Sequence, residues 1–558
     1  MPFARRDQAS WIAVVLFYLL ACGIMLHPLV DFRRLHSASF GGDPRLVIWI
    51  LGWNNHVFLD GVPSLFDANI FHPERNALAL TEHLFGIGLF TLPIYAVSRN
   101  PVLAYNLVWV LSFLLSALCV HLLVWRVLRD QAAAVVAGLV YAFCFFKMQQ
   151  GHAHLQIIWS FWIPLSLVLV DRWFARPTWG RMGALWVCVL LQALASWYLA
   201  VMILVADALW LVWLTLERYF ATGRVAGIGS PRAPLAHLGA ALVLGALLLS
   251  PFVDRYGELS GGNPTEASLG SADLAAYLVP PENTWLGQVL RDLGSTAPRW
   301  IWGERTLYVG YVTLALAGVG LVCAFRERVT AFGPVRFSVA LALVSFALSL
   351  GPADPQNWGW TPFGVFARLP GMTLFRVPAR FALLLMLAVA VLAGVGAWDL
   401  RRRLGKRARL ATILVVPILL GEYFVVDFPG GRPSPLPIPP VYRYLATLPP
   451  GAVVSLPDYL QTAEWYREAD YLYFSTAHWK PIVNGYARAT PAGFAKRIRQ
   501  IETFPSPESA DLLRLLDVSY VVVHAGADKT AVTAARVTDD FTLLLHAGDE
   551  YLFKVSPE

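Results

Sequence analysis

The sequence predicts an all-α polytopic membrane protein with about eleven transmembrane helices, followed by a small α/β domain outside the membrane. Three observations lead to this prediction: the composition, the length of the apolar runs, and the placement of basic residues between them. Of the 558 residues, 57% are hydrophobic and 15% are charged, whereas a soluble domain carries about 25% charged residues. The chain therefore lacks the polar surface that a water-soluble protein of this length needs.

The apolar runs have the length that a helix needs to cross a bilayer, roughly 17–25 residues. The first span, 11–30, follows the basic flank MPFARRDQAS without a small-residue cleavage site, so we expect an uncleaved signal anchor. The segment 82–98 is apolar but short and contains Pro93, and we expect it and 45–59 to be half-inserted or interfacial helices. Further spans are predicted at 101–125, 131–146, 155–171, 182–197, 198–216, 234–252, 307–325, 335–350, 381–398 and 410–427.

Basic residues predict the orientation. If the N-terminus is cytoplasmic, every short loop on that side contains arginine, including the run RRRLGKRAR from Arg401 to Arg409. This is the distribution that the positive-inside rule requires. It also accounts for the net charge of +7 without nucleic acid as a partner. We therefore expect an integral membrane protein with a cytoplasmic N-terminus and its C-terminal part on the non-cytoplasmic side.

The five cysteines all lie inside apolar stretches, without the spacing of a zinc site or a disulfide framework. The remaining chain divides into a transmembrane module at 1–427, a proline-rich linker at 428–440 and a terminal domain at 441–558. In the terminal domain GAVVSLP, PIVNG, SYVVVHAG and FTLLLHAGDEYLFKV have the pattern of strands, and SPESADLLRLLDV that of a capped helix. This alternation predicts an α/β domain.

The first outward segment, 31–100, contains a candidate functional carboxylate. Asp43 follows two glycines and precedes Pro44 in GGDPRL, just beyond the first span. A carboxylate fixed by a turn at the mouth of a helix bundle is poorly explained by stability alone. Asp followed by Pro is also a favourable helix start, with Asp as the N-cap. The sequence leaves both interpretations open.

Two further groups of polar residues are candidates on the same side. Glu82 and His83 open the segment 82–98, where a carboxylate is favoured by the positive end of a helix. Lys147, His152 and His154 lie in KMQQGHAHLQ, a predicted outward hairpin between two spans. Charged groups beside hydrocarbon often face a cavity or a partner, although snorkelling also accounts for Lys147.

Two arginines precede the span at 381–398. Arg376 and Arg380 lie in LPGMTLFRVPARF, at the predicted outer end of that helix. Cations are unfavourable at a helix N-terminus, so two of them indicate an anion, and guanidinium is well shaped for phosphate. Lipid headgroups would also supply that phosphate.

The order of these parts resembles the GT-C superfamily of membrane glycosyltransferases, in particular its bacterial YfhO-like branch, which ends in an extracytoplasmic domain. The resemblance covers nearly the whole chain and is carried by GGDPRL, NIFHPERNALALTEHLFG, NPVLAYNL, GHAHLQ, GMTLFRVPARF, HWKPIVNGY and LLDVSYVVV.

The resemblance implies transfer of a sugar from a polyprenyl-phosphate donor to a cell-envelope glycan, lipid or protein, with inversion. It implies that Asp43 is the catalytic base, with Glu82 as a second catalytic candidate. Phosphate binding would fall to Arg376 and Arg380, and the remaining substrate-binding candidates are His152, His154, His83 and Lys147. No metal site is predicted; a lone Asp replaces the adjacent acidic pair of many relatives, which leaves a divalent metal requirement open.

Two other functions stay open on the sequence. A lipid or glycolipid transporter or flippase is disfavoured because the spans contain no paired Gly/Pro-broken helices in matching halves. The second function is that of a catalytically silent envelope-assembly protein, which would bind a partner through its terminal domain.

Overall fold

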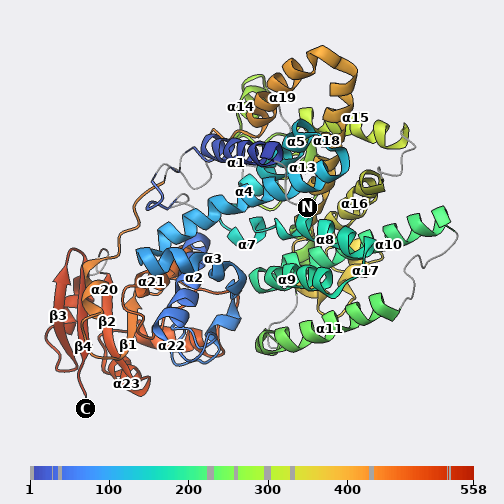
Figure 1. Cartoon of the computed structure of the whole chain (residues 1–558). Coiled ribbons are helices and arrows are strands. Elements are labelled where there is room, and N and C mark those ends of the chain that lie inside the picture. The colour runs from blue at the N-terminus through green and yellow to red at the C-terminus, as the bar shows by residue number, and fades with distance from the viewer. Residues whose placement is uncertain are drawn as a thin grey trace. The chain divides into compact units, whose positions relative to one another are not determined.

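The computed structural model describes residues 5–27, 29, 31–35, 41–222, 232–256, 262–294, 303–326, 333–426, 433–460, 462–524, 526 and 529–557. The chain forms two compact units (Figure 1). The first, helical unit comprises Met1–Val30, Leu107–Ser250 and Ser260–Gly431. The second unit comprises Asp31–Asn106, Pro251–Leu259 and Arg432–Glu558, and contains the only sheet of the described residues.

The helical unit consists of long apolar helices joined by short connections and a few short helices. Its helices are α1 (Arg5–Met25), α4 (Pro101–Leu128), α5 (Gln131–Phe143), α6 (Phe145–Gln150), α7 (Leu155–Ile158), α8 (Trp162–Ala175), α9 (Trp179–Ala195), α10 (Trp197–Thr222), α11 (Arg232–Val253), α12 (Pro264–Leu269), α13 (Leu274–Leu278), α14 (Trp285–Asp292), α15 (Tyr311–Arg326), α16 (Gly333–Ser349), α17 (Pro362–Ala367), α18 (Ala382–Leu404) and α19 (Ala408–Tyr423). The first turns of α4 belong to the second unit.

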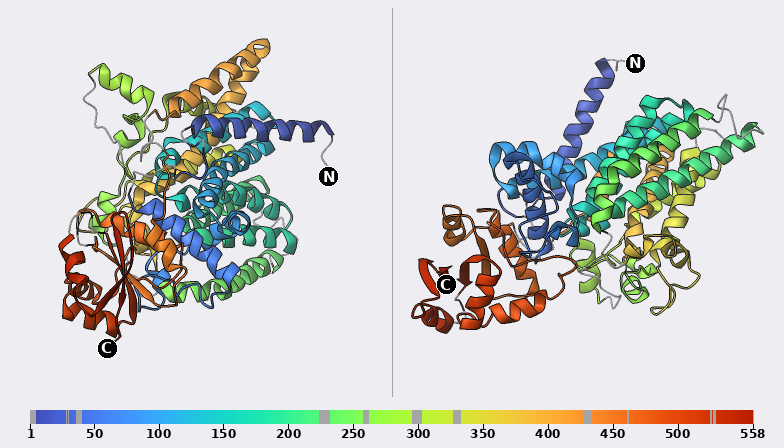
Figure 2. Two further views of the ribbon diagram at one scale, coloured as in Figure 1. Left: turned by 90° about the vertical axis from the view of Figure 1, so that its left-hand side faces the viewer. Right: turned by 90° about the horizontal axis from the view of Figure 1, so that it is seen from below.

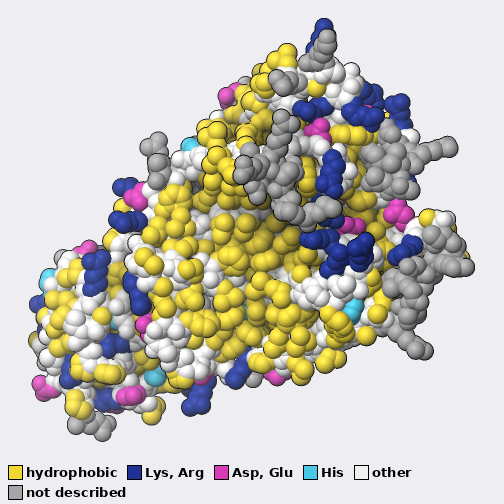
Figure 3. All heavy atoms as spheres, viewed as in Figure 1, with side chains coloured by type: hydrophobic (Ala, Val, Ile, Leu, Met, Phe, Trp, Pro, Cys, Tyr) yellow, Lys and Arg dark blue, Asp and Glu magenta, His cyan; other side chains and the backbone are white. Residues whose placement is uncertain are grey.

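Each span predicted from the sequence coincides with an apolar helix. Among the described residues, six helices are long and apolar enough to cross a membrane, and six more are apolar but shorter. The predicted spans 131–146 and 155–171 are each interrupted, the first at Cys144 between α5 and α6 and the second between α7 and α8. Figure 3 shows a broad area of hydrophobic side chains over the helices on the face drawn in Figure 1. A surface of this kind is suited to lipid rather than water.

The helical unit is centred on α18, which is buried along most of its length and packs against α5, α15 and α16. Its closest partner is α15, and two glycines allow the approach. A Cβ added to Gly320 would lie 1.9 Å from the Leu392 carbonyl oxygen, and one added to Gly396 would lie 1.9 Å from that of Leu316. Because small residues let helix backbones approach within a membrane, this pair of glycines sets the packing of the two helices.

The second unit is built around a four-stranded mixed sheet of order β1-β2-β4-β3, visible in both views of Figure 2. β1 pairs with β2 in parallel, and β2 with β4 and β4 with β3 are antiparallel. The strands are β1 (Ala452–Leu456), β2 (Val518–His524), β3 (Phe541–Ala547) and β4 (Glu550–Val555). Its helices are α2 (Asp43–Asp60), α3 (Phe85–Ser98), α20 (Pro440–Leu445), α21 (Glu468–Ser475), α22 (Phe494–Ile501), α23 (Pro507–Leu515) and α24 (Lys529–Ala535).

The strand and helix predictions for the terminal domain are confirmed except for PIVNG. GAVVSLP contains β1, SYVVVHAG contains β2, and the last run forms the β3–β4 hairpin. The predicted capped helix is α23, where the Ser506 side chain accepts a hydrogen bond from the Ser509 backbone N–H. PIVNG is not a strand: it makes one isolated bridge, between Ile482 and Val453.

The PIVNG backbone instead forms hydrogen bonds with Val453 in β1 and with residues 69–72. The Ile482 N–H donates to the Asn69 carbonyl (2.8 Å), and the His72 N–H donates to the Ile482 carbonyl (2.9 Å). The Asn69 side chain adds a bond to the Ser475 hydroxyl (3.1 Å). The Asn69–Ser475 bond joins residues that are 406 positions apart in the sequence. The compact unit that contains the sheet therefore extends beyond 441–558 and includes Asp31–Asn106.

Candidate active site

Asp43 is the first residue of α2, with Gly42 at the N-cap and Pro44 inside the first turn. The carboxylate therefore lies at the positive end of the helix dipole, which favours its charged form. It accepts a hydrogen bond from the Tyr486 hydroxyl, with an O–O distance of 2.7 Å. The sequence interpretation of Asp43 as the N-cap residue is shifted by one position, because Gly42 occupies the cap.

The two glycines before Asp43 meet different requirements of the fold. Gly41 has φ +100°, a conformation that side-chain-bearing residues rarely adopt. Gly42 has an ordinary φ, but a Cβ there would lie 2.7 Å from the Tyr486 ring and 2.9 Å from the Tyr466 carbonyl oxygen. The GGDP sequence thus allows the start of α2 to lie directly against residues 466–486.

Tyr486 is the residue that fixes this carboxylate. Burial, the nearby Asp43 charge and their hydrogen bond all raise the pKa of Tyr486, so its hydroxyl remains a donor. Its ring stacks on Trp465 with centroids 5.3 Å apart and planes 5° apart. Next to Asp43 along α2, Arg45 pairs with Asp470 (2.5 Å) and donates to the Gly41 carbonyl (2.7 Å). The start of α2 is therefore bound to two residues of the C-terminal part of the chain, through Asp43–Tyr486 and Arg45–Asp470.

Glu82 and His83 precede α3, which begins at Phe85, later than the sequence predicted. The His83 ring is buried, and its Nδ1 accepts a hydrogen bond from the Phe85 N–H (3.0 Å). Burial lowers the pKa of His83 to about 3, so the ring is neutral near pH 7. The buried imidazole thus accepts a hydrogen bond from the first residue of α3, and its role in substrate binding stays a prediction. Glu82 lies near enough to Tyr256 to interact with it electrostatically.

The predicted phosphate-binding arginines lie in the helical unit, on a segment held by backbone hydrogen bonds. The Gly262 N–H donates to the Thr373 carbonyl and the Ala379 N–H donates to the Gly270 carbonyl, each at 2.9 Å. Between these two bonds, the Val377 N–H donates to the Tyr198 hydroxyl (2.9 Å). Arg376, in the middle of the segment, has an exposed side chain. The exposed Arg376 side chain thus lies on a segment whose backbone is held by hydrogen bonds.

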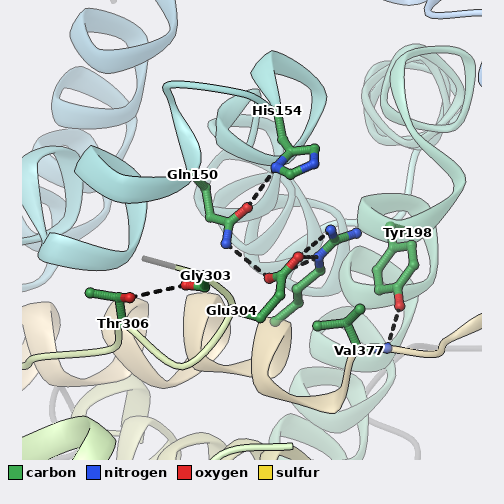
Figure 4. A network of polar contacts seen from close by, with 8 residues as sticks. Gln150, His154, Tyr198, Gly303, Glu304, Thr306 and Val377 are labelled. Carbon is green, nitrogen blue, oxygen red and sulfur yellow. Dashed lines mark hydrogen bonds and ion pairs between the residues drawn. The ribbon is translucent and has the colours of Figure 1, made fainter. Parts of the chain in front are cut away.

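Arg380 has a different environment from Arg376, because it forms an ion pair with Glu304, which is labelled in Figure 4. Its Nη2 and Nε lie 2.5 Å and 3.1 Å from Oε1 of Glu304. The guanidinium also lies over the Tyr198 ring, 4.9 Å from the centroid. The Arg380 charge is therefore balanced by a carboxylate, which the sequence interpretation did not include.

The network continues from Glu304 to a predicted residue, His154. Gln150 donates to Oε2 of Glu304 (2.8 Å), and its amide oxygen lies 3.0 Å from Nδ1 of His154 (Figure 4). Burial alone would raise the pKa of Glu304, but the Arg380 guanidinium, and to a smaller extent His154 and Gln150, lower it below its usual value. Glu304 is therefore ionised, and the structure brings together two predicted binding residues, His154 and Arg380, through two that were not predicted.

Lys147 and His152 are fully buried. The ammonium of Lys147 donates to Ser116 (2.5 Å) and Ser160 (3.2 Å) and lies over the Phe113 and Tyr141 rings. Snorkelling toward the interface therefore does not describe Lys147, and the segment expected to be a hairpin begins as the helix α6. Both residues lie inside the packed bundle rather than at its surface.

Sequence reasoning missed Tyr486, Glu304, Gln150 and Tyr198. Glu304 had one available signal: WGERTLYVG places two charges immediately before a predicted span, where charge is costly unless paired. Tyr486 had none, since only the fold brings it to a residue 443 positions away. Among the described residues, no group of three or more His, Cys, Asp or Glu side chains could hold a metal ion.

No protein-family model matches the sequence, and no curated protein does. The fold, in contrast, is similar to solved membrane glycosyltransferases. The arabinofuranosyltransferase AftD from Mycobacteria is 15% identical, with a TM-score of 0.57 over 100% of this chain and 40% of AftD. ArnT from Cupriavidus metallidurans in the apo state is 11% identical, with a TM-score of 0.51 over 99% of this chain and 100% of ArnT.

The chain thus has the fold of the GT-C superfamily of membrane glycosyltransferases, and it is an integral membrane protein. Identities this low establish the fold and not the activity. Within the superfamily, the YfhO-like branch stays a prediction.

Proposed function

We propose that this protein transfers a sugar from a polyprenyl-phosphate carrier to a cell-envelope acceptor, with inversion at the anomeric carbon. Asp43 acts as the general base that deprotonates the acceptor hydroxyl. The observation that carries this proposal is the Asp43 carboxylate itself, oriented by Tyr486 at a helix N-terminus in a chain with a GT-C fold. A fixed carboxylate is what base catalysis requires.

The two arginines have different roles at the leaving group. Arg376, with its exposed side chain, contacts the departing phosphate. Arg380 is a positioning residue: its pair with Glu304 and its contact with Tyr198 hold the segment that carries Arg376. His154 contributes through Gln150 and Glu304 rather than by direct contact.

Arg376→Ala is expected to raise the KM for the lipid donor by roughly 10–100-fold, because it removes a charge-assisted hydrogen bond to phosphate. The measurement uses purified protein in nanodiscs, a panel of polyprenyl-phosphate monosaccharides tritiated in the sugar, and envelope extract as acceptor. Arg368→Ala is the matched control, since Arg368 is also exposed and lies between the same two predicted spans, 335–350 and 381–398. Its guanidinium lies over the Trp360 ring, 4.4 Å from the centroid. Equal KM values for the two variants would remove Arg376 from the donor site. Movement of the donor across the bilayer without release of polyprenyl phosphate would indicate a flippase instead.

The proposal places the N-terminus in the cytoplasm and the sheet-containing unit outside. Single cysteines at Lys554 and Arg407, both exposed positions, test this orientation. We expect a membrane-impermeant maleimide to label Lys554→Cys on intact cells and Arg407→Cys only after permeabilisation, because the basic loop that contains Arg407 is held on the cytoplasmic side. Labelling of both positions on intact cells contradicts the orientation.

A further inference from the structure

The second unit contains an open cavity of about 830 Å³. It lies between the start of α2, the segment 457–474 and the β2 and β4 ends of the sheet; Gly41, Pro457 and His524 are among its lining residues. Binding sites for small ligands typically measure about 300–1,000 Å³. The cavity is therefore of ligand-binding size and has more room than a single monosaccharide needs.

Aromatic rings form much of its wall. Tyr459, Tyr466, Tyr471 and Phe474 all line the cavity. Tyr459 and Tyr471 lie 6.1 Å apart with their planes inclined by 31°, so they form a continuous aromatic surface. Tyr466 is 38% exposed, which leaves its ring accessible. Flat rings with a hydroxyl at one end can contact an apolar face of a ligand and hydrogen-bond at its edge.

The charges of the lining argue against an anionic ligand. The cavity is lined by two arginines and three carboxylates, and one arginine, Arg45, is already paired with Asp470. The other, Arg467, pairs with Glu464 (3.5 Å), and Asp549 and Glu550 are the other two carboxylates of the lining. Burial lowers the pKa of His524 to about 4, so this residue adds no positive charge near pH 7. Carboxylates accept hydrogen bonds from hydroxyls and repel phosphate. The lining is therefore suited to a neutral ligand rich in hydroxyl groups.

Two of the lining residues are close in sequence to residues of the Asp43 site. Gly41, in its lining, lies two residues before Asp43. Tyr466, in its lining, is adjacent to Trp465, which stacks on Tyr486, the hydrogen-bond donor to Asp43. A ligand in the cavity would therefore be bound by the same small group of segments that orients the carboxylate.

We propose that this cavity binds a neutral oligosaccharide chain, the acceptor glycan of the transfer reaction. The inference rests on the proposed function and narrows its acceptor to a carbohydrate. Tyr459 and Tyr466 stack on sugar rings, and Asp549 and Glu550 accept hydrogen bonds from sugar hydroxyls. The chain end that receives the new sugar points toward Asp43.

The test measures binding without turnover. Full-length Asp43→Asn protein in nanodiscs is applied to an array of neutral linear oligosaccharides, and the affinity for the strongest binder is then measured by titration. We expect at least one oligosaccharide to bind, and Tyr466→Ala, added to the same background, to weaken that binding about tenfold. Tyr444→Ala is the matched control, because Tyr444 is also 38% exposed and belongs to the same unit but is not part of the lining.

Three results overturn the inference: no binding to any oligosaccharide, binding that Tyr466→Ala leaves unchanged, or equal loss in the Tyr444→Ala control. Preferential binding of peptides on a parallel array also overturns it. Sugar transfer by the wild type is measured separately. If the wild type transfers sugar but glycan binding does not depend on Tyr466, only the role of this cavity in acceptor binding is wrong. If glycan binds but no lipid donor supports transfer, only the proposed enzyme activity is wrong.

Discussion

Asp43→Asn is expected to lower sugar transfer by roughly 10²–10⁴-fold, the usual contribution of a general base. The amide has the same size as the carboxylate, and its oxygen can still accept the hydrogen bond from Tyr486. Asn is also tolerated at the start of a helix nearly as well as Asp. The substitution therefore removes the proton-accepting group and little else, so the thermal midpoint and the affinity for the lipid donor should stay close to those of the wild type.

The matched control is Asp60→Asn, at the other end of the same helix. Asp60 is partly exposed and pairs with His56 and Arg99. Loss of such surface pairs costs at most about 1 kcal/mol, so Asp60→Asn should keep nearly full activity. Transfer at the wild-type rate by a folded Asp43→Asn protein would show that the carboxylate is structural. Equal losses in both variants would indicate a general effect on α2.

Gly320→Val is expected to prevent normal assembly of the helical unit. The added Cβ would lie 1.9 Å from the Leu392 carbonyl oxygen, well inside van der Waals contact. This oxygen belongs to the backbone, so no side-chain rotation can move it. α15 and α18 must then separate, and α18 is the most buried of the long helices. Overpacking usually costs about 1–3 kcal/mol, and separation of two central helices adds to this. We expect loss of the monodisperse species in size-exclusion chromatography and a lower thermal midpoint.

Gly318→Val, two residues away on the same helix, is the control. A Cβ at Gly318 meets nothing within 4 Å, so this variant should purify and melt like the wild type. The two substitutions change helix propensity and hydrophobicity equally. If Gly320→Val also purifies and melts like the wild type, α15 and α18 do not approach each other as closely as the structure shows. If both variants fail to assemble, the cause is valine in α15 and not the helix crossing.

The sequence alone was sufficient for the membrane helices and most of the terminal strands. A helix in lipid must satisfy all its backbone hydrogen bonds internally, so its location depends on local composition and length. The runs that became α4, α10 and α18 could therefore be found without tertiary information. The strands β2, β3 and β4 were found for a similar reason, since β-branched alternation and the turn at Gly548 are local features.

PIVNG shows where local reasoning stopped. Its composition is that of a strand, but its backbone partners are divided between Val453 in β1 and residues 69–72, and it forms only an isolated bridge. Strand formation depends on which neighbours are available, and those neighbours lie far away in the sequence.

The candidate site divides in the same way. The sequence by itself determined that Asp43 follows a tight turn and that Arg376 and Arg380 precede a membrane helix, because GGDP and the start of an apolar run are local signals. Only the tertiary structure decided what these groups can do: Tyr486 orients Asp43, Glu304 neutralises Arg380, and Arg376 stays exposed. The physical reason is that the charge and reactivity of a side chain depend on burial and on its partners, and folding brings those partners together from distant parts of the chain.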